Sequence, residues 1–199
     1  MSTAISLEHL ALYEFLTNFG GAGIIRGEAL GPRPPKEAIK GMAKRYWLLK
    51  SEPDCFSIDH LRAAPNQTEH WDGVRNYQAR NTLRDDVKMG DEAFFYHSSA
   101  DPTGIAGICV VSRAGYPDHT AWDPESEHFD PKASPDNPIW YMVDVTLKKR
   151  LCRVLPLSVE KQTPGLEDMM VVQRGSRLSV QPVKPEEWKI ILKLMNDYE

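Results

Sequence analysis

The chain has 199 residues, of which 41% are hydrophobic and 26% charged, enough to build one domain of ordinary size with a flanking segment. Its net charge of −4 argues against a protein that grips long phosphate backbones non-specifically, because that mode of binding needs a broad basic face. The sequence has neither a run of about 18 apolar residues nor a signal-peptide pattern, which predicts a cytoplasmic protein without a membrane partner.

Residues 1–44 differ in character from the rest of the chain. An apolar stretch over 7–16 is compatible with a short helix, but the glycine-rich 20–23 and proline-rich 31–35 segments leave pieces too short to hold a core. The composition predicts a poorly ordered N-terminal extension, with Met42 as the natural start just before the first strand. The alternative is a genuine docking helix.

The first half of the remaining chain predicts strands separated by short helices. Pro53 stops an aromatic and aliphatic run that is typical of a buried strand. Ser57 and Asn76 are predicted N-caps of two helices. Gly104 and Gly107 indicate a bend or a close backbone approach in a later strand. The predicted elements are strands over 46–50, 93–96 and 105–112, and helices over 57–63 and 76–87.

The second half begins with a long acidic loop over 115–138, which holds five prolines. In the strand that follows, alternation places Trp140, Met142 and Asp144 on one face and the intervening residues on the other. Pro185 opens the last helix. The predicted elements are strands over 139–148 and 178–180, and helices over 157–162 and 185–194. This mixture predicts an α+β fold with a compact, curved or barrel-like sheet and peripheral helices.

The three cysteines, Cys55, Cys109 and Cys152, are odd in number and far apart in the sequence. Their spacing fits neither a disulfide framework nor a zinc site, so we expect small core residues of a reducing compartment. We therefore predict no metal and no cofactor.

Catalytic motifs are absent from the sequence, which contains no phosphate-cradling glycine loop, nucleophile elbow or zinc-protease helix. A non-enzymatic protein is the main expectation. His97, Ser98 and Asp144 would form a Ser/His/Asp set if the fold brought them together, since such sets are recognised by geometry. A nucleic-acid-processing hydrolase that uses His97 and Asp144 is thus the alternative, and a small-molecule or protein-interaction module is a third reading.

A binding pocket has stronger support, because polar residues lie next to aromatic ones around Trp71. A flat base is held by stacking on an indole, at about 1–3 kcal/mol per base, while polar groups read its edge. Trp71 is the candidate platform, and a core tryptophan is the alternative. Gly73 would let the backbone approach a ligand or adopt a positive φ. The following residues, Val74, Arg75 and Asn76, extend the predicted pocket wall.

Asp144 interrupts an otherwise apolar strand, and an acid on a mostly covered face needs a partner. The structural partner would be an arginine such as Arg75. The functional partner would be an amino group on a base, for example the exocyclic amine of cytosine. The two readings are compatible with each other.

Polar residues at strand ends complete the predicted site, with strand-end capping as the alternative. The ligand-binding set consists of Lys50, Ser51, Trp71, Gly73, Val74, Arg75, Asn76, His97, Ser98, Asp144, Ser179 and Gln181. Flanking phosphates would contact Arg80, Arg84 and Lys88 or, instead, the basic run 148–153. Solvated faces of a helix and a strand end are the alternative reading of both basic clusters.

Four blocks of sequence carry a resemblance to a known family: 46–53, 71–81, 94–98 and 178–182. In this order and spacing they resemble the EVE domain family over Arg45 to about Leu194. We place the domain at 45–197. The resemblance implies a PUA-like β-barrel with peripheral helices.

The resemblance also implies a ligand. EVE domains look like members of a group that includes the YTH readers of methylated adenine and the SRA readers of methylated cytosine. Lys50, Ser51 and Trp71 match positions of the YTH pattern, whereas Asp144 falls near a cage tryptophan of those domains. A carboxylate in place of an apolar wall suits cytosine. The implied partner is DNA or RNA with a modified base, bound by a monomeric protein.

Overall fold

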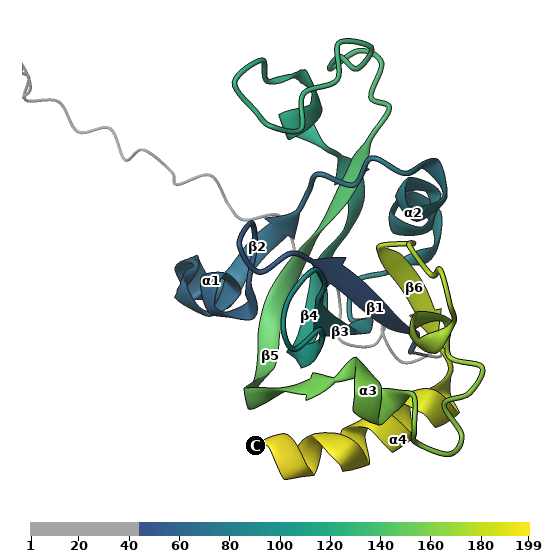
Figure 1. Cartoon of the computed structure of the whole chain (residues 1–199). Helices are drawn as coiled ribbons and strands as arrows, with labels where there is room; N and C mark the ends of the chain where they lie inside the picture. Colours follow the sequence, from purple (N-terminus) through teal and green to yellow (C-terminus); the bar gives the residue numbers. More distant parts are fainter. Residues whose placement is uncertain (1–43) are drawn as a thin grey trace, which may run out of the picture. The chain divides into compact units, whose positions relative to one another are not determined.

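The computed structural model describes residues 44–199, so residues 1–43 of the predicted N-terminal extension lie outside the described part. The described chain forms one mixed sheet with strands in the order β2-β5-β4-β3-β1-β6 (Figure 1). β1 runs parallel to β3, and every other neighbouring pair is antiparallel. The strands are β1 (Tyr46–Ser51), β2 (Thr68–Trp71), β3 (Glu92–His97), β4 (Gly104–Pro117), β5 (Tyr141–Pro156) and β6 (Val180–Val183).

Short helices connect the strands. The Ser57 hydroxyl accepts a hydrogen bond from the His60 N–H at 3.1 Å, and Asn76 accepts from two backbone N–H groups, so both predicted N-caps are confirmed. No helix formed by residues 44–199 is long and apolar enough to cross a membrane. The α-helices are α1 (Ile58–Ala63), α2 (Tyr77–Asn81), α3 (Leu157–Glu160) and α4 (Pro185–Met195). A π-helical turn follows α2 at Thr82–Asp86, and 3₁₀ turns cover Pro65–Gln67, His119–Trp122, Met170–Val172 and Asn196–Tyr198.

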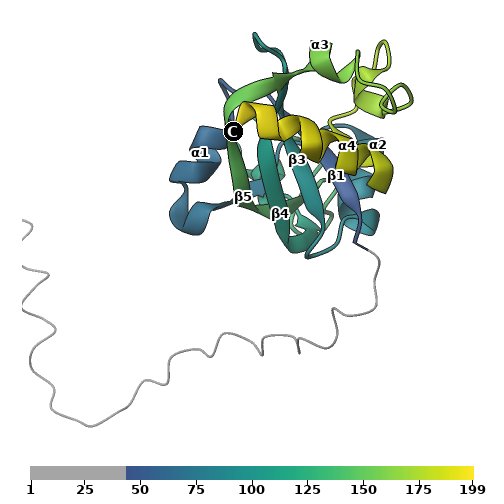
Figure 2. The same ribbon diagram turned by 90° about the horizontal axis from the view of Figure 1, so that it is seen from below.

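The sheet is buried on both faces, which explains why β1 and β3 read as unbroken apolar runs. Helices α1 and α2 and the side chains of Leu49 and Phe95 share the core of one face. Helix α4 lies across the other face (Figure 2), where Trp188 stacks on Phe94 with ring centroids 4.0 Å apart. Along each central strand, alternate side chains therefore pack into the core on one face of the sheet and the core on the other.

The predicted α+β class is confirmed, but the sheet does not close into a barrel. Within residues 44–199, β2 and β6 are edge strands that each pair on one side only. Both edge strands are four residues long and lie at opposite ends of the strand order. The sheet bends instead, because the register between β4 and β5 shifts at several points along their length.

Strands β4 and β5 are longer than the sequence pattern predicts, and β2 was not predicted at all. β5 continues through the basic run 148–153, since ladder pairing uses backbone groups and tolerates polar side chains on an exposed stretch. The predicted close approach at Gly107 is confirmed, because a Cβ there would lie 2.2 Å from the Lys149 carbonyl oxygen. Glycine thus allows two bulged strands to pack tightly.

The cysteines are free, and only one of them is a core residue. Cys109 is buried on β4, as predicted. Cys55 and Cys152 are exposed, so the core prediction is wrong for these two: Cys55 lies in the turn after β1, and Cys152 lies on the outward side of β5.

Candidate functional site

A cavity of about 1170 Å³, called here the larger cavity, opens where β1 and β2 end. Its wall includes the segment 72–76, which links β2 to α2, and the segment 127–128 from the loop between β4 and β5. The structure therefore brings most of the predicted ligand-binding set together. The predicted residues in its lining are Lys50, Ser51, Trp71, Gly73, Val74, Arg75, Asn76 and Ser179.

Trp71 is both a core residue and part of the cavity wall. Only 4% of the residue is exposed. Its indole makes edge-on contacts with the rings of Phe95 and Phe56, with centroids 5.1 Å and 5.7 Å away. Pairing of β2 with β5 sets the Trp71 backbone opposite Val143, and Trp71 is among the residues that line the larger cavity. The two interpretations of Trp71 from the sequence are thus compatible.

Gly73 has the backbone conformation that only glycine adopts easily, with φ at +70°. A Cβ at this position would lie 2.5 Å from His128 Nε2, so the imidazole rests directly on the backbone. The Gly73 N–H donates to Asp118 Oδ2 at 3.2 Å. The predicted need for glycine is met, and its main effect is to let the long loop close against the cavity wall.

Arg75 holds that loop in place. Its Nη1 lies 2.7 Å from Asp118 Oδ2, and its Nε donates to the His128 carbonyl oxygen at 3.0 Å. The Thr120 N–H and hydroxyl donate to the other Asp118 oxygen. Burial alone would raise the pKa of the Asp118 carboxyl, but hydrogen bonds from Thr120 and Arg75 outweigh it and hold this pKa below its usual value.

The sequence pattern did not single out Asp118, which is fully buried. It stands among the many acids of the loop 115–138, where most are exposed. The signal that could have identified it is its place beside Thr120, because an Asp two residues before a Thr caps a short turn.

Asp144 lies outside the residues that line the larger cavity. It accepts a hydrogen bond from the Tyr116 hydroxyl. Burial raises the pKa of Tyr116, and this hydrogen bond raises it further by a smaller amount. The prediction that Arg75 is its structural partner is wrong. The reason is the unexpected length of β4, which carries Tyr116 alongside Asp144 and leaves Arg75 to Asp118.

His97 and Ser98 have structural hydrogen bonds. His97 is buried, and its Nε2 accepts the Ile58 N–H at 3.1 Å, where α1 begins. Burial lowers the pKa of His97, which favours the neutral ring that this hydrogen bond requires. The Ser98 hydroxyl donates to the Ser51 carbonyl oxygen at 3.2 Å. No hydrogen bond or ion pair joins His97 to Asp144 in the described part of the chain.

The predicted residues near β6 also support the fold. The Ser179 carbonyl oxygen accepts the Lys50 N–H at 2.8 Å. Gln181 is buried, is not among the residues that line the larger cavity, and donates through Nε2 to Ser176 Oγ at 3.0 Å and to the Leu178 carbonyl oxygen at 2.8 Å. The Ser179 bond joins the start of β6 to the end of β1, and the Gln181 bonds hold the segment that precedes β6.

The basic residues predicted to contact phosphate are engaged within the protein. Arg84 pairs with Asp85 at 2.7 Å, and the Lys88 ammonium donates to the Asp85 carbonyl oxygen at 2.6 Å. Arg80 donates to Asn81 at 2.8 Å. None of the three lines the larger cavity. The run 148–153 is similarly engaged: Lys148 pairs with Glu92, Lys149 with Glu199 and Arg150 with Asp59.

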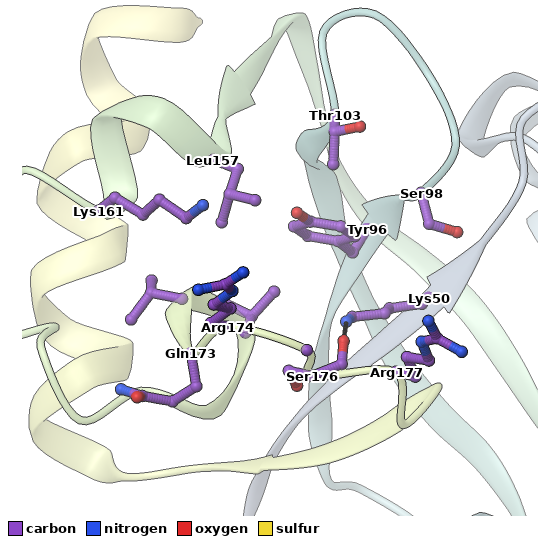
Figure 3. Close-up of a pocket in the computed structure, with 13 residues that line it drawn as sticks. Lys50, Tyr96, Ser98, Thr103, Leu157, Lys161, Gln173, Arg174, Ser176 and Arg177 are labelled. Carbon is purple, nitrogen blue, oxygen red and sulfur yellow. Dashed lines mark hydrogen bonds between the residues drawn. The ribbon is translucent and has the colours of Figure 1, made fainter.

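A second hollow of about 510 Å³, called here the smaller cavity, also has Lys50 in its wall (Figure 3). Lys50 lines both cavities, and its ammonium donates to the Ser176 carbonyl oxygen at 2.9 Å. Ser98 lines this smaller cavity rather than the larger one. The sequence pattern did not reveal the basic residues here, Lys161, Arg174 and Arg177, because they lie on irregular segments without periodicity. Residues 44–199 contain no group of three His, Cys, Asp or Glu side chains that could hold a metal ion.

Comparison with known proteins gives a consistent result. The EVE domain family model matches residues 45–194. Thymocyte nuclear protein 1 of Homo sapiens is 43% identical over 175 residues, which span 80% of this chain and 77% of that protein. A crystal structure of a protein from Pseudomonas putida is 54% identical, covers 75% of this chain and 99% of its own, and has a TM-score of 0.71. The human THYN1 protein in complex with DNA that contains 5-methylcytosine is 43% identical, with coverage of 76% and 98% and a TM-score of 0.70.

Proposed function

The chain belongs to the EVE domain family, and we propose that it is a non-enzymatic reader that holds a modified base of a nucleic acid in the larger cavity. The observation that carries this proposal is the convergence of Trp71, Ser51 and the segment 72–76 on one cavity. A base needs a flat wall and polar groups around its edge. Both are available there within a short stretch of chain.

The relatives point to a modified cytosine. The human THYN1 protein, 43% identical to this chain, has been crystallised with DNA that contains 5-methylcytosine. The larger cavity, at about 1170 Å³, exceeds the roughly 300–1,000 Å³ of ordinary small-molecule sites. This size suits a base together with its sugar and part of the strand.

The acceptor for the cytosine amine differs from the one that the sequence predicted. Asp144 lies outside the larger cavity, whereas Asp72 lines it and directly follows Trp71. A carboxylate accepts hydrogen bonds only, and the exocyclic amine of cytosine donates them. We therefore assign the recognition of the amine to Asp72. Because only 4% of Trp71 is exposed, stacking on its face requires neighbouring wall side chains to move aside.

The hydrolase alternative has little support from the site. The Nε2 lone pair of His97 is occupied by the Ile58 N–H, so it is not free to act as a general base. We retain a monomeric, cytoplasmic protein as part of the proposal. The Homo sapiens relative is named thymocyte nuclear protein 1, and the location of this chain stays a prediction.

Fluorescence anisotropy with the full chain tests the proposal. Oligonucleotides of one sequence, made as DNA and as RNA, would carry cytosine or 5-methylcytosine at a single position. We expect tighter binding of the modified strand and full recovery of intact oligonucleotide by mass spectrometry. Equal affinity for both strands would refute a reader, and product formation that is lost in His97→Gln would support the hydrolase.

The variant Trp71→Phe tests whether the base stacks on Trp71. It should weaken binding of modified and unmodified strands alike, because a smaller ring gives less stacking. Trp188→Phe is the matched control, since Trp188 is buried to a similar degree in the core on the other face of the sheet. Equal binding by both folded variants would show that the base lies elsewhere.

A further inference from the structure

The smaller cavity is lined by cationic side chains without any acid among its lining residues. Its four cations are Lys50, Lys161, Arg174 and Arg177. Across residues 44–199, none of these four lies within 4.0 Å of a carboxylate oxygen. In Figure 3, the Lys161 ammonium and the Arg174 guanidinium point toward the cavity, which Lys50 and Arg177 also line. Cations that line one cavity and lack a carboxylate partner create a site for an anion.

Three other basic residues that the sequence offered as phosphate contacts do not share this property. Arg84, Lys148 and Arg150 each have a carboxylate partner within the chain. An anion that bound to any of these would have to compete with its own acid. The smaller cavity imposes no such competition, so it is the more favourable place for a phosphate.

A buried acid close to this cavity supports the same conclusion. Glu160 is fully buried, and neither of its carboxyl oxygens has a hydrogen-bond partner among the described residues. Burial raises the pKa of Glu160 to about 8, and the nearby Lys50 charge offsets only part of that rise. Around neutral pH the carboxyl is mainly protonated. It therefore adds little negative charge beside Lys50.

We propose that the smaller cavity binds a backbone phosphate of the same strand whose modified base occupies the larger cavity. This inference rests on the proposed function. Lys50 lines both cavities, so a strand that places its base in one passes directly beside the other. The forked guanidinium groups of Arg174 and Arg177 match the geometry of phosphate oxygens. A free phosphate ion or mononucleotide would supply the same chemistry from another source.

Paired charge removal tests the site. Arg174→Gln with Arg177→Gln removes two cations from the smaller cavity, and Lys189→Gln with Lys193→Gln removes two exposed cations of α4 that line neither cavity. Affinity for a single-stranded oligonucleotide with 5-methylcytosine would be measured over a range of salt. The first pair should lower affinity about tenfold or more, and reduce the salt slope by about 0.7 for each phosphate that the protein no longer neutralises. The control pair should match wild type.

A neutral backbone identifies the source of the phosphate. Methylphosphonate linkages, placed in turn on each side of the modified base, should weaken wild-type binding at one position. The same linkage should cause no further weakening in the Arg174→Gln, Arg177→Gln protein. If no linkage affects wild type while inorganic phosphate or deoxycytidine monophosphate shifts the Gly175 amide resonance, the site takes a free phosphate and the strand assignment is wrong.

The two proposals can fail separately. Absence of any preference for the modified base in wild type would refute the reader, while the salt slopes of the two variant pairs would still test the phosphate site. Conversely, if both pairs keep the wild-type slope and affinity, the phosphate site is refuted although the base preference stands. Thermal melting of each variant pair should match wild type, because the substituted side chains lie at the surface.

Discussion

Arg75 and Asp118 form an ion pair, with Nη1 and Oδ2 2.7 Å apart, that fastens the loop between β4 and β5 to the wall of the larger cavity. The Asp118 side chain is fully buried, whereas 24% of the Arg75 side chain is exposed. Because Gly73 and Thr120 donate to the same carboxylate, the pair unites the cavity wall and the loop in one hydrogen-bonded unit.

Removal of the arginine should therefore destabilise the protein. Arg75→Ala leaves a buried carboxylate without its counter-charge, which costs about 3–5 kcal/mol for a buried pair. We expect the lower end of that range, since water reaches part of Arg75. Urea denaturation measures the change. Arg84→Ala breaks the exposed pair with Asp85 and should have little effect. Equal destabilisation of the two variants would contradict a special role for Asp118.

The same pair makes stability depend on pH. The folded-state pKa of Asp118 is depressed. The stability that its carboxylate contributes is therefore fully present above the unfolded-state pKa and is lost as pH falls through the folded-state pKa. Wild type should lose stability on acidification more steeply than Arg75→Ala. Urea denaturation at several acid pH values measures how the free energy of unfolding changes with pH in the two proteins. Equal slopes would show that the Arg75–Asp118 pair is not the source of the pH dependence.

Asn76 allows capping and recognition to be separated. Its Oδ1 accepts from the Gln78 and Ala79 N–H groups at the start of α2, while the same residue also lines the larger cavity. Asn76→Ala should lose about 0.5–2 kcal/mol of stability. Asn76→Asp keeps the cap but replaces the Nδ2 donor with an acceptor, so it should retain stability and bind the base more weakly. Unchanged affinity in Asn76→Asp would leave Asn76 with a capping role only.

Asp144 should matter for stability rather than for the choice of base. Asp144→Asn and Tyr116→Phe each weaken the same hydrogen bond, at about 1–2 kcal/mol. Their effects should be less than additive in the double variant, because each removes an interaction that the other also removes. The ratio of affinities for modified and unmodified strands should stay at its wild-type value. A changed ratio would restore Asp144 to the site.

Glu160 gives a second pH dependence of opposite sign. Its pKa rises from 4.5 to about 8 on folding, so the folded state holds a proton that the unfolded state releases between these values. Stability should fall across that window by at most about 1.4 kcal/mol per pH unit. Glu160→Gln should remove this fall and be the more stable protein at pH 8. Glu167→Gln, at an exposed position, is the control. If the stability of wild type and of Glu160→Gln depended on pH in the same way, Glu160 would have a partner in the folded protein.

The sequence predicted features that depend on neighbours along the chain. Ser57 and Asn76 cap helices where their short polar side chains precede helical runs. The alternation of β5 places Val143 and Val145 on one face, as expected, and both lie in the core. Lys50 and Ser51 reach the larger cavity at the end of β1, a strand that the sequence located, whereas Trp71 reaches it at the end of β2, which the sequence did not predict.

The missed features depend on contacts between distant segments. Asp118 meets Arg75 across 43 positions of sequence, and only because β4 extends to Pro117. No local pattern encodes that extension, since it arises from bulged pairing with β5. Arg174 and Arg177 lie in an irregular loop whose position is set by the packing of neighbouring apolar residues such as Val171.

The pairing of β1 with β6 has a consequence for the synthesis of the protein. β1 begins at Tyr46, but its antiparallel partner is the last strand, where Val180 lies opposite Leu49. Until the ribosome has released that final segment, β1 presents an open strand edge to other chains. For most of its synthesis, the nascent protein therefore contains an apolar, aggregation-prone strand whose partner β6 has not yet been made. Chain termination before Val180 would leave this edge exposed permanently.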